Sequence, residues 1–229
     1  MKGLFLVTPA ILFSLGISPC DFPLARNLSR GEYKFDVRFY GSGGILFSFD
    51  AAILDKFLIG LRYGGTGIVG SEGVKFNPAP GVNVSYLMLD ESRYVPSMMV
   101  GIETQGFDHY IESSERYFIK SRGLYLCVSK EFPFLSGLIL NGGINRTFET
   151  KDEKNGLDLF SSLIFNFSKE FGIFFEYALG YNDPLHKEGI FNSGISFNFI
   201  DQFFFSFSFR DLLSDSYTRT FQVGYRGYL

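Results

Sequence analysis

The sequence predicts an all-β protein, specifically a transmembrane, antiparallel, up-and-down β-barrel of about twelve strands. Three observations lead to this prediction. Apolar residues recur at every second position, which is the period of a β-strand. The alternating segments are about ten residues long, as a tilted strand needs to be to cross a bilayer. The 29 Phe and 13 Tyr residues are spread along the whole chain, which is typical of an apolar surface that faces lipid.

The alternation is clearest near the two ends of the chain. In 33–39, Tyr, Phe and Val alternate with Lys34, Asp36 and Arg38, and in 203–209 four Phe residues occupy every second position. The remaining clear segments are 45–53, 57–63, 82–88, 191–199 and 217–229. The segment 117–129 is the exception, because its apolar parity slips near Gly123, which indicates a bulge or a kink.

The connections between these segments alternate in length. Short connections are expected at 54–56, 90–96, 131–136, 168–170 and 201–202, and long ones at 64–80, 106–116, 148–156, 182–188 and 212–216. Short periplasmic turns and longer outer loops are the asymmetry of an outer-membrane barrel. This count gives an even number of strands and places both chain termini on the periplasmic side.

The first twenty residues predict a cleaved secretory signal peptide. Lys2 supplies the positive start, 3–16 is apolar, and the chain then becomes small and polar. The segment is too short, and too often interrupted by Pro and Ser, for a membrane-spanning helix. The predicted domains are therefore a signal peptide, 1–20, and an outer-membrane barrel, 21–229. A lipoprotein with its lipid on Cys20 is the alternative, although Pro19 fits that signal poorly.

Composition excludes several other classes. The net charge of −3 and the pI near 5.5 give no basic surface for nucleic acid. Cys20 and Cys127, with His109 and His186 far apart in the sequence, do not form a disulfide framework or a metal cluster. No cofactor is expected. A secreted soluble β-sandwich would also alternate in polarity, but it accounts less well for the long strands and for the rhythm of the connections.

Parts of 60–145 resemble a known family. The Gly64-Gly65-Thr66-Gly67 run after a strand, the 77–81 segment (Asn-Pro-Ala-Pro-Gly) and the Pro-started strand at 95–102 carry the resemblance, together with 117–120 and 128–132. This pattern resembles the YjbH-type outer-membrane barrel proteins, which are associated with exopolysaccharide production and export. Family members are longer, so this chain matches a single barrel unit. The resemblance implies a barrel fold and an envelope location, and it supplies no catalytic motif.

The alternation also predicts which charged side chains point into the lumen, since a charge facing lipid near the midplane costs a few kcal/mol. The predicted lumen residues are Lys34, Asp36, Arg38, Asp50, Arg62, Glu103, Lys120, Arg122, Glu176, Arg210 and Arg226. Seven are basic and four are acidic. They would line either a polar channel with a cationic bias or a salt-bridged plug that holds the barrel closed. Both alternatives fit a barrel of about twelve strands.

Three other features of the sequence are candidate chemical sites. Asp108 and His109, with Ser113 and Ser114 nearby, suggest a lipid hydrolase, but they fall in an expected outer loop without a supporting motif. The glycine run at 64–67 lacks the Gly-Lys-Ser/Thr ending of a phosphate loop. The acidic groups at 149, 152 and 153 could meet cations that bridge lipopolysaccharide, or form a solvated loop tip. The protein is therefore not expected to be an enzyme.

The function expected from the sequence is a narrow outer-membrane channel or export component for polar or saccharide material. The alternative is a closed structural or surface-interaction barrel. The expected partners are outer-membrane lipid and lipopolysaccharide, the barrel-assembly machinery through the C-terminal strand at 222–229, and envelope polysaccharide machinery.

Overall fold

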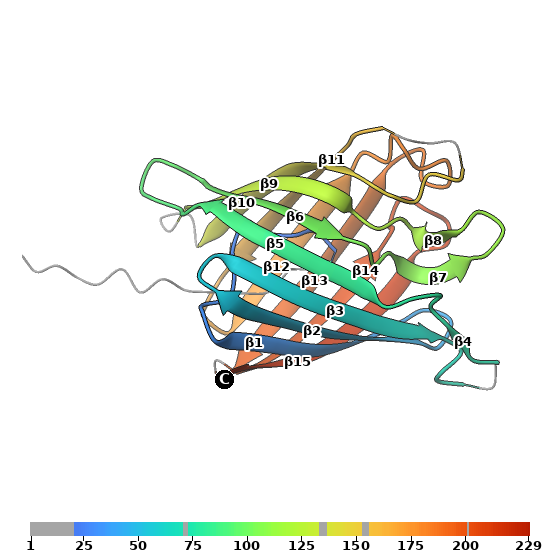
Figure 1. Ribbon diagram of the computed structural model, residues 1–229, viewed down its shortest axis with the longest axis horizontal. Coiled ribbons are helices and arrows are strands. Elements are labelled where there is room, and N and C mark those ends of the chain that lie inside the picture. The colour runs from blue at the N-terminus through green and yellow to red at the C-terminus, as the bar shows by residue number, and fades with distance from the viewer. Residues whose placement is uncertain (1–20, 71–72, 133–136, 153–155, 201) are drawn as a thin grey trace, which may run out of the picture.

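Twelve antiparallel strands close into a β-barrel in the computed structural model, which describes residues 21–70, 73–132, 137–152, 156–200 and 202–229 (Figure 1). The predicted fold class and strand number are confirmed. The predicted leader, 1–20, lies outside the described residues. Among the described residues, no helix has the length and hydropathy needed to span a membrane.

Each barrel strand pairs with the next one around the wall. In this order the strands are β1 (Glu32–Tyr40), β2 (Gly44–Leu54), β3 (Phe57–Thr66), β5 (Gly81–Leu89), β6 (Ser97–Glu103), β9 (Gly123–Phe132), β10 (Leu138–Arg146), β11 (Asp158–Asn166), β12 (Phe171–Ala178), β13 (Ile190–Phe199), β14 (Phe203–Arg210) and β15 (Thr218–Tyr228). The last strand pairs with the first, with Phe35 opposite Tyr225. The wall therefore has no free edge whose backbone groups would need other partners.

Three short strands lie outside this wall. The two residues of β4 (Lys75–Phe76) extend the ladder of β3. The strands β7 (Phe107–Ile111) and β8 (Arg116–Ile119) pair only with each other and form a hairpin at one end of the barrel (Figure 1). This end is called the loop end, because the long connections lie there.

The opposite end carries the short connections and is called the turn end. The amide of Leu229 donates to the carbonyl of Gly31 there, at 2.8 Å, so both ends of the strand series meet at the same side. Each long connection that the structure describes follows a strand that runs from the turn end to the loop end. The tight turn at 41–43, between β1 and β2, is the exception to the predicted rhythm, because it is a short connection at the loop end.

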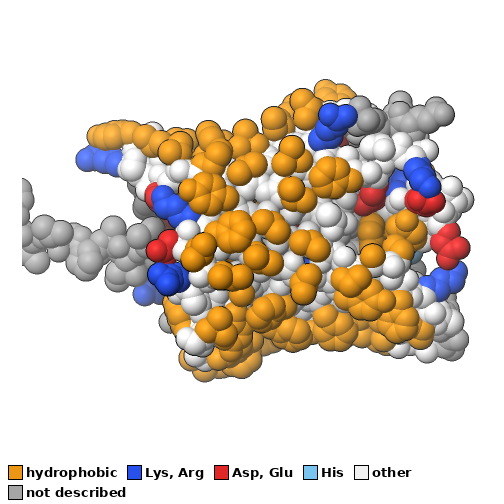
Figure 2. All heavy atoms as spheres, viewed as in Figure 1, with side chains coloured by type: hydrophobic (Ala, Val, Ile, Leu, Met, Phe, Trp, Pro, Cys, Tyr) orange, Lys and Arg blue, Asp and Glu red, His pale blue; other side chains and the backbone are white. Residues whose placement is uncertain are grey.

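The two faces of each strand differ in the way that the alternation predicts. On β1, Phe35 and Phe39 are exposed, whereas Asp36 and Arg38 are buried. On the face shown in Figure 2, apolar side chains are spread over the middle of the wall, while charged side chains lie toward the two ends. Exposed Phe, Leu and Tyr side chains in the middle of many strands are stable only against an apolar medium, so this surface is suited to lipid.

The segment 117–129, predicted as one strand with a slip, is divided into two elements. β8 ends at Ile119, and β9 begins at Gly123. Gly123 has a φ of +63°, and a Cβ there would overlap the carbonyl oxygen of Arg146. The β9–β10 ladder shifts register at the same place. Glycine is therefore required where the chain leaves the outer hairpin and enters the wall.

Candidate functional site

The eleven predicted lumen charges all lie in described parts of the chain. Ten are buried, and Arg62 is partly buried, with its side chain 14% exposed. Nine belong to barrel strands, whereas Lys120 and Arg122 lie between β8 and β9. The structure brings most of these residues together in groups, and two of the groups are completed by residues that were not predicted from the sequence. Arg226 lies over the ring of Phe204, with its guanidinium carbon 5.5 Å from the ring centroid.

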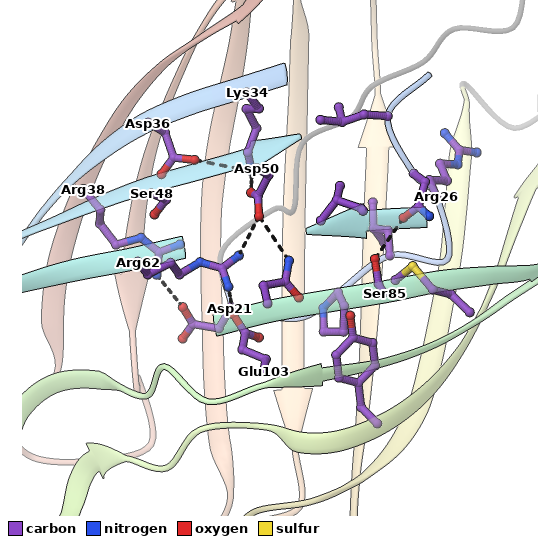
Figure 3. Close-up of a pocket in the computed structure, with 18 of the residues that line it drawn as sticks. Asp21, Arg26, Lys34, Asp36, Arg38, Ser48, Asp50, Arg62, Ser85 and Glu103 are labelled. Carbon is purple, nitrogen blue, oxygen red and sulfur yellow. Dashed lines mark hydrogen bonds and ion pairs between the residues drawn. The ribbon is translucent and has the colours of Figure 1, made fainter. Parts of the chain in front are cut away.

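One group lies on the wall formed by β1, β2, β3 and β6. Lys34 lies 3.3 Å from both Asp36 and Asp50, and Arg62 lies 3.8 Å from Asp50 and also pairs with Glu103 (Figure 3). Gly60, opposite Asp50 on β3, leaves the space that this carboxylate occupies, since a Cβ there would overlap Oδ1 of Asp50. Buried charges need such partners, and the two basic and three acidic groups of this wall supply them to one another.

The segment that fills the lumen was not predicted from the sequence. Residues 21–31, here called the lumen segment, precede β1 and contact inward side chains on strands from all sides of the barrel. Their wall partners include Arg38, Ser85, Ser129, Asn141, Glu176 and Arg210. The prediction assigned 21–229 to the barrel without distinguishing these residues. Asp21, Phe22 and Leu24 have no alternating period, so the only available signal was their apolar and acidic character just after the predicted leader.

Asp21 makes more of the described hydrogen bonds and ion pairs than any other residue of the lumen segment. Arg38 donates to its Oδ1 at 2.8 Å, and Arg210 donates to its Oδ2 at 2.6 Å. The guanidinium of Arg210 also lies 3.3 Å from Asp108, at the start of the outer hairpin. The carboxylate of Asp21 thus bonds to both β1 and β14. Through Asp108, Arg210 also contacts the hairpin at the loop end.

Phe22 gives the interior an apolar centre. Its ring lies 5.2 Å from the ring of Phe160, and the guanidinium carbon of Arg122 lies 3.9 Å from its centroid. The buried cluster around it consists of Phe22, Ala25, Leu46, Met99, Phe107, Ile119, Tyr125, Cys127, Phe160, Ala178 and Ile190. The lumen is thus partly a hydrophobic core, whereas the sequence indicated a polar second face. Such a core stabilises the segment in place.

The lumen segment closes the turn end through polar contacts. Arg26 lies 2.6 Å from Glu131 on β9 and 3.5 Å from Glu91 in the β5–β6 connection. Asn27 donates to the carbonyl of Lys56 at 2.6 Å and accepts a hydrogen bond from Ser85. A cavity of about 90 Å³ remains between the segment and the wall that carries Lys34 and Arg62. This volume holds a few waters, so the lumen segment fills most of the space beside this wall.

The loop end has its own ion-pair group. Arg116, on the outer hairpin, lies 2.7 Å from Asp183 and 2.8 Å from Asp152, and Lys120 lies 2.6 Å from Asp152. Glu149 accepts hydrogen bonds from the amides of Tyr117 and Ser121, both at 2.9 Å. The predicted loop acids at 149 and 152 thus tie the hairpin to the β10–β11 connection, whereas Asp183 ties it to the β12–β13 connection. The third, Glu153, lies outside the described residues.

His186 belongs to this loop-end group. Its Nδ1 lies 2.9 Å from Asp183, and its Nε2 lies 3.2 Å from Asp211, without the alignment of a hydrogen bond. Burial alone would lower the pKa of His186, but the hydrogen bond and the charges of its acidic neighbours outweigh burial and raise it to about 9. Burial would raise the pKa of Asp183, but His186 and Arg116 lower it to about 2. Both groups are therefore charged near neutral pH.

The residues weighed for lipid hydrolysis have other partners. The carboxylate of Asp108 lies against Arg210, and the ring of His109 stacks on Phe118 at 5.2 Å. Between Asp108 and His109, the described contacts include no hydrogen bond of the kind that orients a general base. Within the described parts of the chain, no group of three or more His, Cys, Asp or Glu side chains could hold a metal ion.

Comparisons with known proteins identify the fold. No protein-family model and no curated protein matches the chain. A solved structure of the KdgM porin is 12% identical, with a TM-score of 0.53, over 86% of this chain and 98% of that chain. A KdgM porin in complex with disordered oligogalacturonate is 13% identical over the same shares, with a TM-score of 0.54.

A third solved structure, the outer membrane channel DcaP of Acinetobacter baumannii, is 7% identical over 86% of this chain and 96% of that chain. Its TM-score of 0.31 is too low for a comparison of folds. The KdgM similarity concerns the fold alone: the chain is a closed antiparallel β-barrel with the architecture of an outer-membrane porin.

Proposed function

We propose that the protein is an outer-membrane barrel for the passage of small polar solutes, with saccharides as the favoured class, and that the lumen segment closes it. One observation carries the proposal. The barrel wall is complete without the segment, because β1 begins at Glu32 and pairs with β15 along its length. Displacement of residues 21–31 would open the lumen and leave every strand ladder intact.

The outer membrane is the proposed location. The exposed apolar side chains around the wall need a lipid environment. Apart from the tight turn at 41–43, the short and long connections lie at opposite ends, as in barrels of that membrane. The signal peptide at 1–20 would bring the chain there. Lipopolysaccharide as a partner, and the barrel-assembly machinery acting on the C-terminal strand, are parts of the same proposal.

The carboxylate of Asp21 predicts the selectivity of the open state near Arg38 and Arg210, although the lumen segment as a whole, with Arg26 and Arg30, carries a net charge of +1. Asp21 supplies negative charge to Arg38 and Arg210. When the segment leaves, both guanidiniums face the lumen without this carboxylate, and Arg122 loses the ring of Phe22. The local wall then becomes more positive, which favours anionic solutes. Acidic saccharides combine such a charge with hydroxyl groups for the polar wall.

Two similarities support a saccharide. The KdgM porin, which has a similar fold, was solved with oligogalacturonate, and parts of the sequence resemble YjbH-type proteins associated with exopolysaccharide export. Membership of that family, and a link to envelope polysaccharide machinery, remain proposals. The aromatic residues Phe107 and Tyr125, beside the ion pairs of the wall, would offer apolar contacts to sugar rings once the segment moves.

Planar-bilayer recording of the mature protein and of Phe22→Ala tests the proposal. The wild type should be closed for most of the time and open briefly. Loss of the Phe22 ring should raise the open fraction several-fold and give an anion-selective current that acidic oligosaccharides reduce. Phe167→Ala is the matched control, because Phe167 is exposed in the β11–β12 turn, outside the lumen.

Two results would contradict the proposal in different ways. If wild type and Phe22→Ala conducted equally and continuously, the segment would not close the barrel. If neither conducted, the barrel would be permanently closed. That second function, a structural or surface-interaction barrel, is favoured by the buried network of Asp21, Arg38 and Arg210, which is costly to separate.

A further inference from the structure

Two arginines on the barrel wall hold the carboxylate of Asp21. Arg38, on β1, donates to its Oδ1 at 2.8 Å. Arg210, on β14, donates to its Oδ2 twice, from Nε at 3.0 Å and from Nη2 at 2.6 Å. All three residues are buried. Both carboxylate oxygens thus accept hydrogen bonds from a guanidinium, which is the side-chain donor whose planar shape suits a carboxylate best.

Other residues also hold these two arginines, here called the arginine clamp. The guanidinium carbon of Arg38 lies 4.8 Å from the ring centroid of Phe107, and that of Arg210 lies 4.9 Å from the same centroid. Arg38 also donates to Gln222 on β15, and Arg210 donates to both oxygens of Asp108, each at 3.3 Å. Phe107, Asp108 and Gln222 belong to the hairpin and the wall. The clamp is therefore supported from outside the lumen segment, as a preorganised binding site would be.

The clamp borders the space that remains in the lumen. Asp21, Arg38, Phe107 and Gln222 are among the residues that line the cavity of about 90 Å³ beside the segment. Figure 3 shows Asp21 and Arg38 among these lining side chains. The carboxylate of Asp21 is thus held at the edge of a polar cavity, where a second small anion would meet the same two guanidiniums.

We propose that the arginine clamp is a binding site for the carboxylate of a small acidic sugar, and that Asp21 occupies it as an internal competitor. This proposal rests on the proposed passage of solutes and names the site that such a solute binds. Exchange of one carboxylate for another leaves both arginines paired, which avoids the cost of an uncompensated buried charge. An acidic sugar therefore releases the lumen segment, whereas a neutral sugar of the same size leaves it in place.

Competition with Asp21 determines how tightly the sugar binds. Because Asp21 is part of the same chain, it is present at a high effective concentration. The apparent affinity for the sugar is reduced to the extent that the clamp is already occupied. Removing the charge of Asp21 should therefore strengthen binding, and removing a clamp arginine should weaken it. Damage to the fold alone would weaken binding in both cases.

The first test uses the wild-type protein in detergent micelles, with sodium glucuronate as the probe and glucose, with sodium chloride at equal ionic strength, as the neutral control. Hydrogen exchange is measured at the amide of Ala25, which donates to Ser129 on β9 and does not contact the clamp. Glucuronate should speed this exchange several-fold relative to glucose. Equal exchange with the two sugars would contradict the proposal.

The second test measures glucuronate binding by isothermal titration calorimetry. Asp21→Asn should bind glucuronate about ten-fold or more tightly than the wild type. Asp55→Asn, which removes an exposed acid in the β2–β3 turn, should match the wild type. Adding Arg38→Gln to Asp21→Asn should abolish the gain, and adding Arg219→Gln, at an exposed position on β15, should preserve it. Equal affinities of Asp21→Asn and the wild type, or a gain that survives Arg38→Gln, would overturn the proposal.

Binding and conduction can fail separately. Tighter glucuronate binding by Asp21→Asn, together with no current in any bilayer recording, would support the clamp and refute the passage of solutes. A current through the wild type, together with equal affinities of the wild type and Asp21→Asn, would refute the clamp and support passage.

Discussion

Oδ2 of Asp21 lies 2.6 Å from Nη2 of Arg210, although the two residues are 189 positions apart in the sequence. The contact joins the segment before the first strand to the second-last strand of the barrel. Both residues are fully or almost fully buried. An intact buried ion pair of this kind adds little net stability, because both charges are desolvated, but removing one partner is strongly destabilising, because it leaves an uncompensated buried charge.

Arg210→Met should therefore destabilise the folded barrel by about 3–5 kcal/mol, since it leaves both Asp21 and Asp108 without this cation. Urea unfolding of the protein in detergent micelles, followed by the mobility of unboiled samples on gels, measures the change. Arg219→Met is the matched control, because Arg219 is exposed on β15 and lies over the ring of Phe209. Equal effects of the two variants would mean that the Asp21 contact does not hold in solution.

Ser129→Ala should loosen the lumen segment and spare the wall. The hydroxyl of Ser129 accepts a hydrogen bond from the buried amide of Ala25 at 2.8 Å. Without it, that amide lacks this acceptor, at a cost of about 1–3 kcal/mol. Hydrogen exchange should accelerate by about ten-fold or more across 21–27 and stay unchanged in β12 and β13. Uniform acceleration over the whole barrel would indicate a global effect and contradict the prediction.

The loop-end group predicts a pH dependence. The pKa of His186 is raised above its ordinary value of 6.5 to about 9, so its contribution to stability is complete below about 6.5 and is lost as the pH rises through about 9. The pKa of Asp183 is lowered from 3.8 to about 2, so its contribution is complete above 3.8 and is lost as the pH falls through about 2. The group is most stable between these limits.

Tryptic cleavage at Lys187, measured relative to the exposed Lys169 in a turn at the other end, checks this dependence. The ratio should rise several-fold between pH 7 and pH 9.5 in the wild type, as His186 loses its proton. His186→Gln should give a high ratio at both pH values, whereas His109→Gln should behave like the wild type. A flat ratio in the wild type would show that His186 does not hold the loop.

The two faces of the barrel wall could be predicted from the alternation of apolar and polar residues in the sequence. A strand has a strict two-residue period, and a charge facing lipid is costly, so Phe35 had to face outward and Asp36 inward. The same rule placed Arg38, Asp50 and Arg210 on the inner side. It works because each choice depends only on neighbours in the sequence and on the contrast between lipid and lumen.

The filling of the lumen could not be predicted in this way. Asp21 meets Arg38, Glu176 and Arg210 only after the barrel has closed, and no periodicity marks the segment that carries it. The division of 117–129 was also beyond the pattern. A parity slip at Gly123 signals a break, but whether it is a bulge within one strand or a change from hairpin to wall depends on the tertiary packing around Arg146.

The last prediction concerns the side chains on the outward face of the barrel wall. Phe49, at the centre of β2, is exposed and pairs across the ladders with Phe35 and Leu61. Phe49→Arg should place a charge near the bilayer midplane and destabilise the barrel in liposomes by about 2–4 kcal/mol. Phe76→Arg, on β4 beyond the wall, should cost about 0–1 kcal/mol, because it lies toward the interface.

Urea titrations of both variants in liposomes and in detergent separate the two sites. The penalty at Phe49 should shrink in detergent micelles, whose thin apolar layer lets water reach the guanidinium, and an equal penalty for both variants in liposomes would mean that the outer wall does not face lipid.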